Sequence, residues 1–114
     1  MTKLLIVDDS AEMRDLLRSV MKKNCEEIFE CADGDEVLAA FSAHQPDWVV
    51  MDVEMKRMDG LKATANLLRA HPDANVIILT QHADIETRIA ARAAGARFFV
   101  SKDDLLDVRL LIEG

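Results

Sequence analysis

The stretch Trp48-Val49-Val50-Met51-Asp52-Val53-Glu54-Met55 indicates how the whole chain folds. Four apolar residues run together and stop at a carboxylate. A continuous apolar run of this length is typical of a strand buried on both faces, as in a parallel sheet. Ligands bind at the carboxyl ends of the strands in open α/β sheets. Asp52 is therefore predicted to lie at the lip of a sheet, in a position to carry chemistry.

Similar apolar runs lie on both sides of this stretch and alternate with segments of helical spacing. They predict further strands over residues 4–7, 28–32, 76–80 and 98–100. The second run is less purely apolar, which favours a place near an edge of the sheet. A fivefold alternation of strand and helix predicts right-handed crossovers and an α/β fold, a doubly wound parallel sheet with helices on both faces.

The expected helices begin at capping residues and end at helix breakers. Pro46, Pro72 and Gly95 mark three of the ends. In the helix after Gly60, the residues expected to face inward are Leu61, Thr64, Ala65 and Leu68. The expected N-terminal caps are Asp9 or Ser10, then Asp33 with Glu36 in a capping box, then Asp84, then Asp103 or Asp104.

Composition predicts one cytoplasmic domain over residues 1–114. Half of the 114 residues are hydrophobic, which is enough for a core without metal or disulfide staples. The net charge of −7 disfavours direct nucleic-acid binding, which needs clustered lysine and arginine. Cys25 and Cys31 are six residues apart, which fits neither a redox motif nor a zinc site, so both are expected to be reduced. No apolar run approaches a signal peptide or a membrane span.

Polar side chains follow four of the five predicted strands at the point where each strand ends. Three carboxylates brought together in this way repel one another and need a cation, and a hard, oxygen-binding divalent ion such as Mg²⁺ suits them. A lysine and a hydroxyl beside them complete a set suited to phosphoryl transfer. The carboxylate on the most central strand is the expected nucleophile, which would become an acyl phosphate. The residues are Asp8, Asp9, Asp52, Thr80 and Lys102.

With these residues the whole chain resembles the response-regulator receiver domains of two-component signalling. The resemblance rests on the pair Asp8-Asp9, Asp52 within D-x-x-M, the following Met58-Asp59-Gly60, Thr80 and Lys102. It implies the flavodoxin-like strand order 2-1-3-4-5, as in chemotaxis regulators. The pair Lys102-Asp103 resembles receivers joined to DNA-binding domains of the LuxR type.

The resemblance also implies a role for each site residue. Asp52 would accept a phosphoryl group from a histidine kinase or a histidine phosphotransfer protein. Mg²⁺ would be held by Asp8, Asp9, Asp52 and the backbone carbonyl of Glu54. Thr80 and Lys102 would contact the phosphoryl group. Thr80 and Phe99 would then switch the face formed by the fourth helix, fifth strand and fifth helix, which a downstream output partner or a second copy reads. Such a domain is regulatory and is not a turnover enzyme.

Departures from the family pattern leave alternatives open. Lys56 stands where proline is frequent, and Gln81 stands where a small residue is usual. They motivate a second hypothesis, a protein-interaction module of receiver fold that works without phosphate. An aspartyl phosphatase is a weaker third, since Glu54 stands where such enzymes carry a second aspartate. Glu54, Gln81 and His82 are expected to set the dephosphorylation rate. The short last helix suits either a receiver cut from a longer regulator or a stand-alone one.

Overall fold

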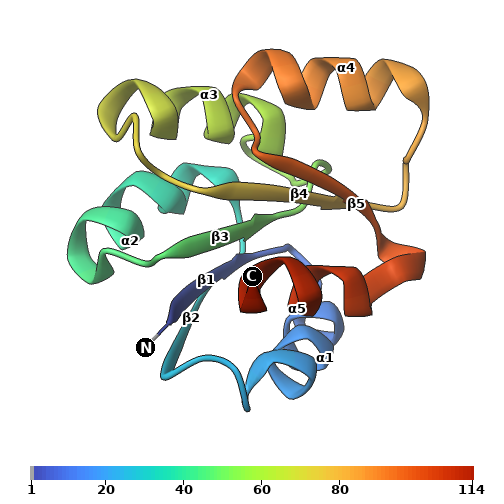
Figure 1. Ribbon diagram of the computed structural model, residues 1–114. Coiled ribbons are helices and arrows are strands. Elements are labelled where there is room, and N and C mark those ends of the chain that lie inside the picture. The colour runs from blue at the N-terminus through green and yellow to red at the C-terminus, as the bar shows by residue number, and fades with distance from the viewer. Residues whose placement is uncertain (1) are drawn as a thin grey trace.

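A five-stranded parallel sheet in the order β2-β1-β3-β4-β5 forms the centre of the protein (Figure 1). The computed structural model describes residues 2–114. The predicted fold class and strand order are confirmed, and β2 is an edge strand as expected. The strands are β1 (Lys3–Val7), β2 (Glu27–Cys31), β3 (Trp48–Met51), β4 (Val76–Thr80) and β5 (Phe98–Ser101).

Five α-helices cover the two faces of this sheet (Figure 1). On one face α1 and α5 bury Leu17 and Val108 against β1, β3 and β4. On the other face α2, α3 and α4 pack Phe41, Leu67 and Ala91 onto the same strands. The central strands are therefore buried on both sides, which explains their continuous apolar runs. The helices are α1 (Ala11–Met21), α2 (Val37–His44), α3 (Gly60–Ala70), α4 (Ile85–Ala94) and α5 (Leu105–Glu113).

Several helix ends lie where the sequence places them. The Asp84 carboxylate caps α4 by accepting from the Thr87 N–H at 2.7 Å. Gly95 follows α4 in the left-handed conformation, with φ of 102°. The α2 helix ends at His44, two residues before Pro46. At α1 the cap is Ser10, whose hydroxyl accepts from the Met13 N–H.

Two predicted caps are confirmed only in part. Asp33 caps the 3-10 turn Gly34–Glu36 that leads into α2, accepting from the Asp35 N–H, but the Glu36 carboxylate accepts from Ala32 and does not complete the predicted capping box. Asp104 precedes α5 without a side-chain capping bond. The Ser101 hydroxyl instead accepts from the Asp103 N–H and caps the 3-10 turn Lys102–Asp104. In both cases a turn of 3-10 helix separates the capping side chain from the α-helix.

The inward face of α3 is also turned from the predicted one. The buried positions are Ala63, Thr64 and Leu67, while Leu61 and Leu68 are half-buried. Small side chains permit the closest approach to the sheet, and the buried Thr64 hydroxyl donates to the Gly60 carbonyl at 2.7 Å. Within residues 2–114 no helix is both long and apolar enough to cross a membrane.

Candidate functional site

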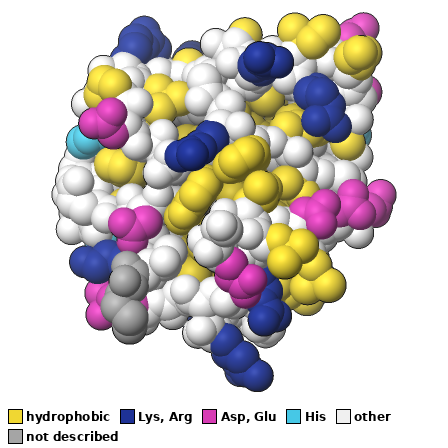
Figure 2. Space-filling model, in the orientation of Figure 1, with side chains coloured by type: hydrophobic (Ala, Val, Ile, Leu, Met, Phe, Trp, Pro, Cys, Tyr) yellow, Lys and Arg dark blue, Asp and Glu magenta, His cyan; other side chains and the backbone are white. Residues whose placement is uncertain are grey.

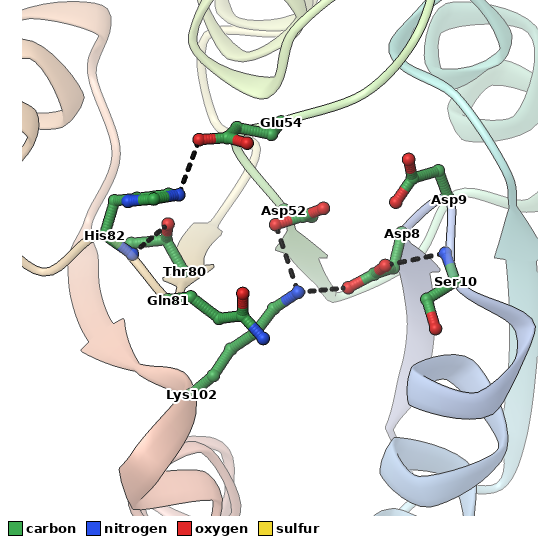
Figure 3. Close-up of a pocket in the computed structure, with 9 residues that line it drawn as sticks. All are labelled: Asp8, Asp9, Ser10, Asp52, Glu54, Thr80, Gln81, His82 and Lys102. Carbon is green, nitrogen blue, oxygen red and sulfur yellow. Dashed lines mark hydrogen bonds and ion pairs between the residues drawn. The ribbon is translucent and has the colours of Figure 1, made fainter.

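A pocket of about 240 Å³ opens at the carboxyl edge of the sheet (Figure 3). Its walls come from the ends of β1, β3, β4 and β5 and the residues that follow them. Eight of the nine predicted site residues line it, and Phe99 lies elsewhere. The lining residues are Asp8, Asp9, Ser10, Asp52, Glu54, Thr80, Gln81, His82 and Lys102.

The parallel ladder places two of the carboxylates side by side. The Asp8 N–H donates to the Cys31 carbonyl at 3.1 Å, and the Asp52 N–H donates to the Val7 carbonyl at 2.9 Å. Sheet pairing thus continues one residue past each strand. Asp8 is 1% exposed and Asp52 is 7% exposed, so both carboxyl groups lie largely out of water.

The three aspartates form a suitable oxygen donor set for a hard cation. Asp8, Asp9 and Asp52 each offer a carboxylate oxygen, and these oxygens all lie within 4.8 Å of one another. Mg²⁺ prefers one or two carboxylates and completes its shell with carbonyl, water or phosphate oxygens. The donor chemistry and spacing therefore fit Mg²⁺.

Lys102 bridges the two buried carboxylates. Its Nζ lies 3.0 Å from Asp8 Oδ2 and 3.2 Å from Asp52 Oδ1 (Figure 3). Burial and the neighbouring charge of Asp8 raise the pKa of Asp52 to about 6, although Lys102 opposes the rise. Burial disfavours the charge on Lys102, but hydrogen bonding and attraction from both carboxylates outweigh it and raise its pKa. The site is therefore a buried acidic cluster whose mutual repulsion is only partly offset by the positive charge of Lys102.

The raised pKa of Asp52 predicts that Asp52→Asn stabilises the metal-free protein at neutral pH. The carboxyl group of Asp52 has a pKa of about 6 in the folded protein, against an ordinary value of 3.8. It therefore favours the folded state most below pH 4. That contribution is lost as the pH rises through 6, because the unfolded chain then carries the charge at less cost. Each pKa unit is worth about 1.4 kcal/mol, so after partial screening the variant should gain about 1–3 kcal/mol at pH 7.5.

Urea unfolding in EDTA at pH 7.5 and pH 4 measures this difference. The gain of Asp52→Asn over wild type should shrink towards zero at pH 4, where both proteins carry a neutral side chain at this position. A gain of equal size at both pH values, or a loss at pH 7.5, would contradict the electrostatic origin.

The opposite side of the pocket carries a hydroxyl and a contact between a histidine and a carboxylate. The buried Thr80 Oγ1 accepts from the His82 N–H at 3.0 Å and keeps its own proton to donate. His82 Nε2 lies 2.6 Å from Glu54 Oε1, which joins the loops after β4 and β3 at the mouth. The exposed Gln81 also lines the pocket (Figure 3). All three side chains therefore lie around the same pocket as Asp52.

Phe99 lies outside this pocket on the β5 strand. It is half-buried, and the guanidinium of Arg88 on α4 lies over its ring, 4.6 Å from the centroid. In the β4–β5 pairing Thr80 is opposite Ser101, and Phe99 is opposite Ile78. Phe99 is thus two residues along the same strand pair from the pocket.

Two further residues support the site although the sequence gives no sign of it. Arg14 donates to the Asp8 carbonyl at 2.7 Å and pairs with Glu30 on β2 at 2.9 Å. Asp33 accepts from the backbone N–H groups of Arg57 and Met58, in the loop after β3. The Arg14–Glu30 pair and the two Asp33 bonds join residues 16 to 25 positions apart, so local spacing gave no signal for them.

Comparisons with known proteins agree with this geometry. A family model described as response regulator receiver domain matches residues 4–111. The uncharacterized transcriptional regulatory protein YhcZ of Bacillus subtilis is 37% identical over 103 residues, covering 89% of this chain and 48% of that protein. The chemotaxis protein CheY of Listeria monocytogenes is 34% identical, covering 90% of this chain and 87% of that protein. The chain thus spans about half the length of some curated relatives and most of the length of others.

Solved structures give the same result. A LuxR-family two-component response regulator from Aurantimonas sp. superposes with a TM-score of 0.91 at 27% identity, covering 99% of this chain and 83% of that one. A chain of the CheX-CheY-BeF3-Mg complex of Borrelia burgdorferi gives a TM-score of 0.85 at 26% identity, covering 96% of this chain and 84% of that one.

Proposed function

The chain belongs to the response regulator receiver domain family, and we propose that it works there as a phospho-accepting receiver with Asp52 as the acceptor. One observation carries this proposal: three carboxylates converge within 4.8 Å, with Lys102 bridging two of them. Keeping such a cluster ionised costs free energy, and a bound cation would offset this cost by neutralising the repulsion between the carboxylates.

The proposed reaction is a transfer from a phosphohistidine of a histidine kinase or a histidine phosphotransfer protein. A carboxylate oxygen of Asp52 attacks phosphorus, the P–N bond breaks, and the donor imidazole keeps the electron pair and takes up a proton. Lys102 moves its charge from the carboxylates to the phosphoryl oxygens, and the Thr80 hydroxyl donates to one of them. Mg²⁺ would be held by Asp8, Asp9, Asp52 and the Glu54 carbonyl. When bound, it would neutralise part of the negative charge on the carboxylate and phosphoryl oxygens.

We place this domain among regulatory proteins of the cytoplasm that do not turn over an external substrate. It would catalyse only the gain and loss of its own phosphoryl group. Receiver domains are regulatory, which supports this view. Its net charge of −7 argues against direct nucleic-acid binding by this domain.

Phosphorylation would switch the face built from α4, β5 and α5. An aspartyl phosphate adds negative charge and acceptor oxygens, which draw the Thr80 hydroxyl toward Asp52. The space that Thr80 leaves admits the Phe99 ring, which then breaks its contact with Arg88. A local charge change thus selects between two side-chain arrangements, and an output domain or protein reads the difference.

The same face is suited to a second copy of the chain. Basic side chains gather over α4 and acidic ones toward α5, with apolar side chains between them (Figure 2). A two-fold axis would set the basic part of each copy against the acidic part of the other. Sedimentation with and without beryllofluoride tests this, and a monomer in both conditions would refute it. The basic residues are Arg88, Arg92 and Arg97, the acidic ones Asp103, Asp104 and Asp107, and the exposed apolar ones Ile85, Ile89, Leu106 and Leu110.

Beryllofluoride, an analogue of the phosphoryl group, tests the proposed function against a phosphate-independent module. With Mg²⁺ it should bind saturably and shift the NMR signals of Asp52, Thr80 and Phe99. Omitting Mg²⁺ is the control and should remove the shifts. Spectra unchanged by beryllofluoride with Mg²⁺ would favour the phosphate-independent module.

We propose that Gln81, His82 and Glu54 set the lifetime of the acyl phosphate. Gln81→Ala should change the dephosphorylation rate several-fold, because the amide borders the approach of water to Asp52. Phosphate release after removal of the phosphodonor measures this rate. Gln45→Ala, at the end of α2 and outside this pocket, is a matched control and should decay like wild type. Equal dephosphorylation rates for both variants would mean that the Gln81 side chain does not affect the attack of water on the acyl phosphate.

A further inference from the structure

The loop between β3 and α3 is held by a buried carboxylate from another part of the chain. Asp33 follows β2 by two residues and is 1% exposed. Its Oδ2 accepts from the Arg57 N–H and its Oδ1 from the Met58 N–H, both at 2.9 Å. Two backbone donors of the loop therefore depend on one side chain.

The next residue brings the two segments into direct contact. A Cβ atom on Gly34 would lie 2.5 Å from the Met58 carbonyl oxygen, so only glycine permits this approach. On the surface beside this contact, the exposed Arg57 side chain pairs with Asp35 at 2.7 Å and with Glu36 at 3.1 Å. Exposed ion pairs are worth about 0–1 kcal/mol, so the buried contacts of Asp33 carry the larger share.

This loop contains Glu54, whose carbonyl belongs to the proposed metal site. At Lys56 the loop lacks the rigid backbone that proline would supply. The Lys56 side chain is exposed, and among the described residues no group accepts from its backbone N–H. The loop must therefore be held by contacts outside itself.

We infer that Asp33 is a positioning residue for the metal site, holding the β3–α3 loop so that the Glu54 carbonyl faces the aspartate cluster. This inference rests on the proposed function. Burial alone disfavours the charge on Asp33, but the N–H groups of Arg57 and Met58 outweigh it and lower its pKa, so the carboxylate is ionised at neutral pH. Both oxygens are then available as acceptors.

Mg²⁺ binding to the whole chain, followed by isothermal titration calorimetry, tests the inference. Asp33→Asn keeps the size of the side chain but offers one acceptor oxygen, and its amide hydrogens then face a backbone N–H. Groups that orient metal ligands typically change affinity by about 10–100-fold, so we expect roughly tenfold weaker Mg²⁺ binding. Arg57→Ala removes the surface ion pairs and keeps the backbone donors, so its affinity should stay within about twofold of wild type.

A second variant separates positioning from general destabilisation. Adding Lys56→Pro to Asp33→Asn restricts the loop backbone without restoring the lost hydrogen bonds. Measured where circular dichroism shows every variant folded, the double variant should recover several-fold of the lost affinity. Unchanged binding in Asp33→Asn, or an equal loss in Arg57→Ala, overturns the inference. Failure of the wild type to bind Mg²⁺ would instead overturn the proposed function.

Discussion

Asp52→Asn should abolish Mg²⁺-dependent labelling of this protein by acetyl phosphate. The amide is a poor nucleophile for phosphorus, and the neutral side chain no longer contributes a charge to the cation site. Intact-protein mass spectrometry after incubation with acetyl phosphate and Mg²⁺ measures the label. Wild type should gain one phosphoryl group per chain, and the variant should gain none.

The matched control for this result is Asp73→Asn. It makes the same chemical change at an exposed aspartate between α3 and β4, at the opposite end of the sheet from the pocket. Its labelling should equal that of wild type. If Asp52→Asn is labelled as strongly as wild type, the acceptor is another residue. Because Asn has nearly the volume of Asp and keeps the backbone bond to Val7, misfolding would not explain a loss.

The central part of this architecture could be predicted because it depends on short-range signals. Each apolar run ends at a polar residue, and parallel strands bring those ends to one edge. Asp8, Asp52, Thr80 and Lys102 were therefore expected together, and the structure brings them into one pocket. The distances between them could not be predicted, because the 3.0 Å contact of Lys102 with Asp8 depends on side-chain conformation.

The errors arose where a residue has partners distant in sequence. Asp33 looked like an ordinary helix cap, but its carboxylate is turned toward Arg57 and Met58, more than twenty residues away. The face of α3 was misjudged because the spacing of leucines suggested one orientation. Close approach at Gly60 and Ala63 sets another. Local patterns thus predicted the elements well and their contacts less well.

Gly60 is the position where one added carbon should do the most damage. It is the first residue of α3, and its N–H donates to the Val53 carbonyl at 2.8 Å. A Cβ atom here would lie 1.8 Å from the carbonyl oxygen of Asp52 and 2.9 Å from Met51 Cγ. The nearest atom belongs to the backbone of a buried strand end, which cannot turn aside as a side chain could.

Gly60→Ala should therefore push α3 away from the strand end and displace Asp52 with it. Overpacking of this kind costs about 1–3 kcal/mol or more, and a contact with backbone lies at the upper end. For a domain of this size that is a fall of roughly 10–20 °C in the unfolding temperature. Thermal unfolding measures the stability, and beryllofluoride binding with Mg²⁺ measures the site in the molecules that remain folded.

The control for this substitution is Gly114→Ala, where φ is 80° but an added Cβ atom meets nothing within 4 Å. The left-handed backbone makes alanine slightly unfavourable there, so the unfolding temperature should fall far less than in Gly60→Ala, and beryllofluoride binding should stay unchanged. If Gly60→Ala matched wild type in both measurements, α3 could shift at no cost. Asp52 would then owe its position to the sheet alone, through its backbone bond to Val7. We expect instead that stability and binding fall together, because the same backbone carries the clash and the acceptor.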